Sequence, residues 1–237
     1  MHAEILLSCQ LVGHFHGQMS LPNIAYIHSL HFQPEHRPIL KQLVPWQQLE
    51  QSTQYWFDSL RQRHIQDMRL DLFGQYPLIY TRFNDGTLSA WRSDWQFNDL
   101  EQQWDIDYYE SLCKLEKFPV LTTVDNRQDF LIVLHKLEHL AQVIGETQFA
   151  QIFHRAAGTL AQTSHSIREL QQQLFLAAQQ AWVFGGMGSW NDAAPYLAAE
   201  QGLEQDYQHL TEQLHRQIRQ ALMYAVNFAK TSSRTTT

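Results

Sequence analysis

Alternating apolar and polar positions predict strands near the beginning of the chain. Between residues 24 and 32 every second position is the more apolar one, a period of two that is typical of a half-buried strand: Ile24, Tyr26, His28, Leu30 and Phe32. Residues 4–12 are predicted as a partner strand, because Gly13 and Gly17 mark a turn region between the two segments.

The following segment predicts two helices on either side of a hairpin. Apolar positions in residues 47–64 fit helical spacing better than strand spacing. Asn84-Asp85-Gly86 separates two strand-like segments, and Asp-Gly supplies the positive φ that a tight hairpin turn requires. Residues 98–117 are predicted as a helix, with Asn98 or Asp99 as its N-cap.

The second half of the chain predicts a bundle of helices. Apolar residues recur at helical spacing in four stripes, within residues 130–144, 149–160, 167–181 and 203–228. The connections between the first three stripes are short, so neighbouring helices are expected to be antiparallel. The Ser/Thr-rich tail, residues 231–237, is expected to be disordered.

Length and pattern together predict an α+β protein. A chain of 237 residues and 27.8 kDa lies at the upper end of what one hydrophobic core holds, and 44% apolar residues suffice for a core. We expect an N-terminal antiparallel sheet with helices in residues 1–120. This lobe would pack on a C-terminal antiparallel helical bundle in residues 121–230.

Charge, cysteines and apolar runs restrict the partners and the location. The net charge of −7 argues against binding along nucleic-acid phosphates and favours a basic partner. Cys9 and Cys113 are interpreted as buried free thiols. The N-terminus lacks a basic secretory start, and no run approaches the ~20 apolar residues of a membrane helix. We therefore expect a cytoplasmic protein with neither a cofactor nor a membrane partner.

One motif with metal chemistry lies in the first stripe of the bundle. His135, Glu138 and His139 form an H-x-x-E-H pattern, in which two His at i and i+4 share a helical face and the Glu activates water. Both His fall opposite the apolar stripe, however, and no downstream acidic helix supplies a third ligand. A solvated helix face is the favoured interpretation, and a zinc-dependent hydrolase is the alternative.

A glycine-rich string follows the third stripe. It contains Gly185, Gly186, Gly188, Ser189, Trp190, Asn191 and Asp192. We interpret it as a structural corner, in which Gly185 or Gly186 ends a helix in a left-handed cap and Ser189 with Asp192 forms a capping box. A phosphate cradle is the alternative, but no Lys or Arg lies between positions 168 and 216 to neutralise a phosphate.

This string, Gly-Gly-Met-Gly-Ser-Trp-Asn-Asp, resembles a segment of small bacterial proteins. Several of those proteins look like immunity proteins that are paired with polymorphic or contact-dependent toxins. The resemblance spans roughly residues 165–228 and does not extend into the N-terminal lobe. It implies a protein that binds and neutralises a cognate toxin.

Residues 91–110 are a second, independent candidate for a binding surface. They combine six carboxylates with six large rings, Phe97 among them, and contain one basic residue, Arg92. Carboxylates steer a basic partner, and large rings anchor it. The alternative is that the rings lie in the core and the carboxylates solvate an outer face. The residues expected to contact the partner are Trp91, Asp94, Trp95, Asp99, Glu101, Trp104, Asp105, Asp107, Tyr108, Tyr109 and Glu110.

The sequence therefore supports one hypothesis of function and leaves two alternatives. We expect a non-enzymatic immunity protein that occludes the active surface of a basic protein toxin. The alternatives are a zinc-dependent hydrolase at the H-x-x-E-H helix, and a structural or adaptor protein whose helical half mediates oligomerisation.

Overall fold

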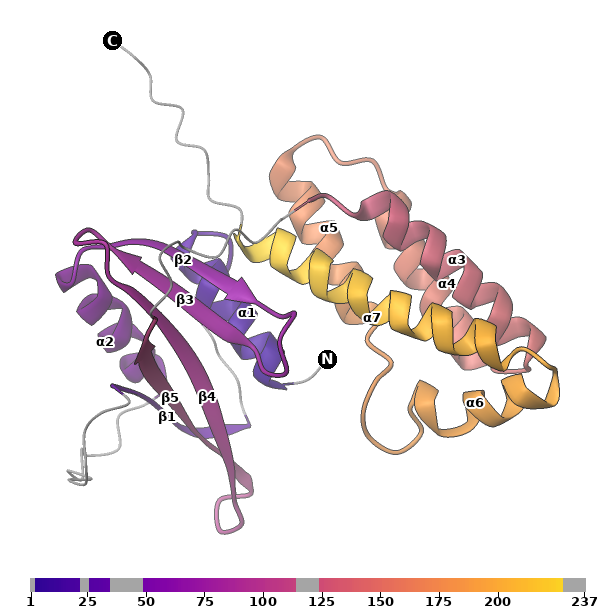
Figure 1. Cartoon of the computed structure of the whole chain (residues 1–237), viewed down its shortest axis with the longest axis horizontal. Coiled ribbons are helices and arrows are strands. Elements are labelled where there is room, and N and C mark those ends of the chain that lie inside the picture. Colours follow the sequence, from indigo (N-terminus) through magenta and orange to yellow (C-terminus); the bar gives the residue numbers. More distant parts are fainter. Residues whose placement is uncertain (1–2, 22–25, 35–48, 114–123, 228–237) are drawn as a thin grey trace. The chain divides into compact units, whose positions relative to one another are not determined.

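The structure is a computed structural model that describes residues 3–21, 26–34, 49–113 and 124–227. These residues belong to two compact units (Figure 1). The first three ranges make up the sheet unit, and the last range makes up the helical unit. The molecule is α+β, as the sequence predicts. None of the described helices combines the length and the apolar character that crossing a membrane requires.

The sheet unit is built on one five-stranded sheet in the order β1-β5-β4-β3-β2. Its strands are β1 (Ile27–Pro34), β2 (Ile65–Asp71), β3 (Leu78–Phe83), β4 (Leu88–Asn98) and β5 (Gln103–Leu112). β1 runs parallel to β5, and the other neighbouring pairs are antiparallel. The sheet is therefore mixed rather than antiparallel throughout. Alternation along a strand is the same in both pairings, so the sequence pattern did not distinguish them.

Two helices cover one face of this sheet: α1 (Ala3–Phe15) and α2 (Leu49–Gln62). The hydroxyls of Ser8 on α1 and Tyr108 on β5 are hydrogen-bonded at 3.0 Å. Trp56 on α2 stacks on Phe32 of β1, with ring centroids 4.2 Å apart. The core of the unit thus lies between α1, α2 and one side of the sheet.

α1 occupies the segment that was predicted as a strand over residues 4–12, and that prediction is wrong. Leu7, Cys9, Leu11 and Val12 are all fully buried, and so is Ser8 between them. A helix that is buried on most of its sides has no polar face, so its sequence lacks helical periodicity and resembles a buried strand. The helix predicted over residues 47–64 is confirmed as α2.

The two cysteines differ in their surroundings. Cys9 is buried in α1, as predicted, and burial raises the pKa of its thiol far above the ordinary value. Cys113 follows β5 and is only partly buried, so the prediction of a buried thiol there is wrong. Burial also raises the pKa of the Cys113 thiol.

The helix predicted over residues 98–117 is also wrong in the part that the structure describes, because β5 lies there. Asn98 does cap a backbone turn: its Oδ1 accepts hydrogen bonds from the N–H groups of Leu100 and Glu101, at 3.1 and 3.2 Å. Hydrogen bonds of this kind can begin a helix, but at Asn98 they stabilise the turn of a hairpin. Beyond it Trp104, Ile106 and Tyr108 alternate with aspartates, which is the period of a strand.

The hairpin predicted at Asn84-Asp85-Gly86 is confirmed between β3 and β4. Gly86 adopts φ +83°, a conformation that L side chains rarely take. The turn is closed by a hydrogen bond from the N–H of Phe83 to the carbonyl of Thr87, at 3.0 Å. Asp85 Oδ1 accepts from the N–H of Thr87 at 2.9 Å, and this bond lowers the pKa of the Asp85 carboxyl.

The helical unit contains five helices among its described residues: α3 (Arg127–Val143), α4 (Thr147–Ala161), α5 (Ile167–Gln180), α6 (Trp190–Glu200) and α7 (Glu204–Asn227). α3, α4 and α5 pack in sequence, α7 packs against α3 and α5, and α6 packs against α7. The four predicted stripes are confirmed as the buried faces of α3, α4, α5 and α7, except that Ile167 at the start of α5 is 54% exposed. The predicted disordered tail, residues 231–237, lies outside the described residues.

We expect the sheet unit to lose stability as the pH falls, because of His16. Its Nε2–H donates to the carbonyl of Met68 on β2 at 2.8 Å, yet burial dominates and lowers the pKa of His16. Because the pKa of His16 is lower in the folded state than in the unfolded state, the neutral imidazole contributes stability. This contribution is fully present at pH values above the pKa of histidine in the unfolded chain, about 6.5. That stability is lost as the pH falls through the folded pKa.

Amide hydrogen exchange of β2 measured between pH 7.5 and pH 5 tests this expectation after correction for the intrinsic exchange rate. The free energy of opening should fall more steeply in the wild type than in His16→Gln, which keeps a donor to Met68. His139→Gln, at an exposed position on α3, is the matched control and should behave as the wild type does. Equal slopes in the wild type and His16→Gln would contradict the assignment.

Candidate functional site

The H-x-x-E-H residues lie on α3. The motif would place Glu138 beside a metal held by His135 and His139, but in the structure the Glu138 carboxylate contacts His154 on the next helix. Glu138 Oε1 lies 2.9 Å from Nδ1 of His154 on α4, and its Oε2 lies 3.5 Å from Nδ1 of His135. His135 and His139 are exposed. Among the described residues, no three His, Cys, Asp or Glu side chains form a group suited to a metal ion. The carboxylate therefore links α3 to α4, and nothing in this geometry favours the hydrolase alternative.

The glycine-rich corner is in part what the sequence predicts. The Asp192 carboxylate accepts a hydrogen bond from the backbone N–H of Ser189 at 2.9 Å, which confirms the capping box at the start of α6. The predicted cap at Gly185 or Gly186 is wrong, because α5 ends at Gln180 and its C-cap is Ala181, at φ −80°. The glycines serve the loop instead: Gly185, Gly186 and Gly188 all have positive φ.

Trp190 at this corner is a core residue of the helical unit. It is fully buried, and its ring meets those of Phe149, Phe153 and Tyr207 at centroid distances of 5.2, 5.3 and 5.5 Å. Its Nε1–H donates to Thr211 Oγ1 at 2.9 Å. The hydroxyl of Tyr207 in turn donates to Asn191 Oδ1 at 3.1 Å. Residues 189–192 are thus accounted for by packing and capping, and the three glycines by the positive φ of the loop.

The residues predicted to contact a partner form the β4–β5 hairpin, and the sheet sorts them onto two faces. Residues that are directly paired across a ladder share a face. Phe97 pairs with Trp104, and Trp95 pairs with Ile106, on the face that carries α1 and α2. Asp94 pairs with Asp107 on the opposite face. The carboxylates and the rings that alternate in the sequence therefore point in opposite directions.

Trp91 and Tyr108 are buried inside the unit, so the prediction that they contact a partner is wrong, whereas Glu110 is only partly buried. Trp91 and Tyr108 are 3% and 1% exposed, because they lie under α1 and α2. Burial raises the pKa of the Tyr108 phenol well above its ordinary value. Glu110 forms an ion pair with Arg63, which follows α2, at 2.8 Å. Their strand positions turn all three side chains towards the helices.

Three rings remain accessible near the end of the hairpin, and we call Trp95, Phe97 and Trp104 the aromatic ledge. The ring centroid of Trp104 lies 5.9 Å from that of Trp95 and 5.2 Å from that of Phe97. Phe97 is 46% exposed, and Leu100 in the adjoining turn is 93% exposed. The Nε1–H of Trp95 is buried and has no acceptor among the described residues. The ledge is therefore an apolar surface that contains one unsatisfied hydrogen-bond donor, the Nε1–H of Trp95.

Three aspartates lie on the opposite side of the hairpin, and we call Asp94, Asp105 and Asp107 the carboxylate face. Asp105 accepts hydrogen bonds from the Ser29 hydroxyl and, at 3.0 Å, from Asn98 Nδ2. No ion pair with a Lys or Arg of the described chain neutralises these three charges. Asp94 stands directly opposite Asp107, an arrangement of like charges that disfavours folding. The charge is therefore retained at a cost in stability.

Other predicted residues border these surfaces. Asp99 and Glu101 are exposed in the turn at the end of the hairpin. Tyr109 shares the carboxylate face, and its pKa is raised by burial, then by Asp107 and Asp94. The sequence alone predicted that these residues lie near one another, because they are close along the chain.

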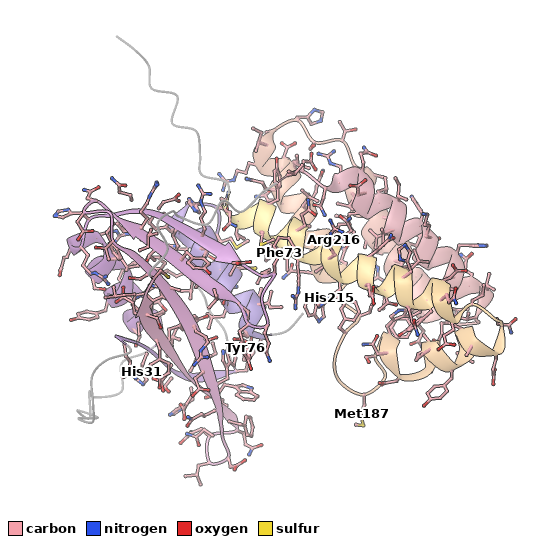
Figure 2. The ribbon with its side chains drawn as sticks, viewed as in Figure 1. His31, Phe73, Tyr76, Met187, His215 and Arg216 are labelled. Carbon is pink, nitrogen blue, oxygen red and sulfur yellow. The ribbon has the colours of Figure 1, made fainter. Side chains whose placement is uncertain are left out.

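The contribution of β1 to this surface is not evident from the sequence. Gln33 Nε2 donates to Asp107 Oδ1 at 2.7 Å, and His31 is the Cα partner of Asp107. His31 is exposed on β1 (Figure 2). The alternation along residues 24–32 signalled a strand with a polar side, but the parallel register with β5 depends on long-range pairing that a local pattern does not carry.

Comparison with family models, with curated proteins and with solved structures found no match to this chain. The assignment of function therefore depends on the geometry of the described residues.

Replacing Trp190 should destabilise the helical unit strongly. We expect Trp190→Ala to lower the free energy of unfolding by about 3–5 kcal/mol, because it removes a buried ring and leaves a cavity. Met187, which projects from the loop between α5 and α6 (Figure 2) and is fully exposed, provides the control. Met187→Ala should change the free energy by less than about 0.5 kcal/mol in the same urea titration. Equal effects of the two variants would contradict the role given to Trp190.

Proposed function

We propose that this protein is a bacterial immunity protein, which binds a cognate protein toxin in the cytoplasm and occludes the toxin's active surface. The observation that carries the proposal is the end of the β4–β5 hairpin, where a partly exposed aromatic ledge lies on one side and aspartates without an ion pair to a described Lys or Arg lie on the other. The resemblance of the glycine-rich string to immunity proteins supports the same function, although that string itself is structural in this chain.

The two parts of the hairpin end have different physical roles in such binding. Rings that are partly exposed in the free protein lose water on contact, and buried aromatic anchors supply most of the energy of a protein interface. Uncompensated carboxylates contribute less to affinity, but they attract a basic surface and raise the rate of association. A basic protein partner is therefore the expected one. Nucleic acid is not, because its phosphates would be repelled.

Co-expression with the product of the adjacent reading frame is the direct test of the function. If that product is a toxin, the wild-type protein should restore growth and bind the toxin in a purified system. Absence of both protection and binding would overturn the proposal.

Removal of the Phe97 ring should weaken toxin binding without unfolding the protein. We expect Phe97→Ala to raise the Kd about ten-fold or more, mainly through faster dissociation, because an anchor ring is lost. Tyr196→Ala is the matched control, since Tyr196 is an exposed ring on α6, at 74%. Surface plasmon resonance separates the two rate constants. An unchanged dissociation rate in Phe97→Ala would exclude the ledge as an anchor.

Reversal of charge on the carboxylate face should act on association instead. At low salt we expect Asp94→Lys to slow association about ten-fold, with a smaller effect at high salt, because screening weakens steering. Glu212→Lys makes the same change of charge at an exposed position on α7 and is the control. If both variants slow association equally, the net charge and not the carboxylate face steers the partner.

A further inference from the structure

The end of the hairpin presents chemically different surfaces on its two sides. Along β4 the side chains of Asp94, Trp95, Gln96 and Phe97 point alternately to the carboxylate face and to the aromatic ledge. The ledge is apolar, and the opposite side holds the three aspartates together with neutral amides and, one ladder position further along β4 on the same face, the exposed Arg92. A partner with one flat docking surface would contact only one of these sides.

The hairpin end is also accessible around its edges. β3 pairs with β4 only as far as Trp91, and the ladder between β1 and β5 begins at Trp104. In the described structure, the ladder partners of residues 95–103 therefore lie only within the hairpin itself. The end of the hairpin projects past β1 and past both helices of the sheet unit (Figure 1). No described element of the unit prevents contact from both sides at once.

We propose that the end of the β4–β5 hairpin inserts into a cleft of the partner, with an apolar wall against the aromatic ledge and a basic wall against the carboxylate face. This inference rests on the proposed function and specifies its mode. The chemistry follows from complementarity, because buried rings require apolar contact and uncompensated aspartates require positive charge.

Site-specific photocrosslinking tests the insertion. Gln96 and Phe97 are adjacent, both are exposed, and they point to opposite sides of the hairpin. p-Benzoylphenylalanine is placed at each position in turn in the full-length protein and mixed with the product of the adjacent reading frame. We expect both variants to crosslink to it, at peptides from two different walls of one cleft. The same group at Gln142, exposed on α3, is the control and should give no crosslink.

Each outcome has a definite meaning. Crosslinks from only one of the two positions would overturn insertion and would leave the proposed function standing. Crosslinks from neither position, while the wild-type protein still binds, would place the interface elsewhere and would also overturn insertion. Failure of the wild-type protein to bind or protect overturns the proposed function itself. Circular dichroism of the two labelled variants establishes that they are folded before the comparison.

A second measurement does not depend on the photoreactive group. Phe97→Ala and Asp94→Asn alter opposite sides of the hairpin, so insertion requires both to raise the Kd for the same partner. We expect the two fold-changes to multiply in the double variant, because the side chains face different walls. A loss of affinity in Phe97→Ala with none in Asp94→Asn at low salt would indicate one-sided docking and would overturn insertion.

Discussion

The alternation of side chains along β4 and β5 is the constraint on which the rest of the sheet unit depends. With one side of the sheet covered by α1 and α2, every second residue of the hairpin enters the core, and its neighbours do not. Trp91 and Tyr108 are buried for this reason, and Asp94 and Asp107 are excluded from the core for the same reason. Towards the end of the hairpin the helices no longer cover the rings, and the aromatic ledge becomes accessible.

The hairpin end is poorly optimised for the stability of the isolated chain. Two aspartates face one another across a ladder, large rings stay partly in water, and an indole N–H is buried without an acceptor among the described residues. Each feature disfavours the isolated fold. A basic and apolar partner would relieve the first two features, whereas the indole N–H is buried within the protein itself.

Local chemistry can be shared by different structures, and two sequence motifs illustrate this. Asn98 accepts backbone hydrogen bonds in the way that a helix N-cap does, yet it holds a hairpin turn. Glu138 belongs to an H-x-x-E-H pattern, yet its nearest partner is His154 from the next helix. In both places the residue types were interpreted correctly as hydrogen-bonding groups. Which partner they meet is decided by packing beyond the local segment.

The sequence by itself determined the α+β class, the four amphipathic helices, the Asp-Gly turn and the capping box at Ser189 and Asp192, because periodicity and turn chemistry are local properties. It also located the acidic and aromatic segment. Only the tertiary structure decided that α1 is a helix, that β1 is parallel to β5 and brings Gln33 to Asp107, and which rings are buried. Those outcomes depend on contacts between residues far apart in the chain. In addition, a helix or strand that is buried on all sides has no alternation of polar and apolar residues from which its type could be predicted.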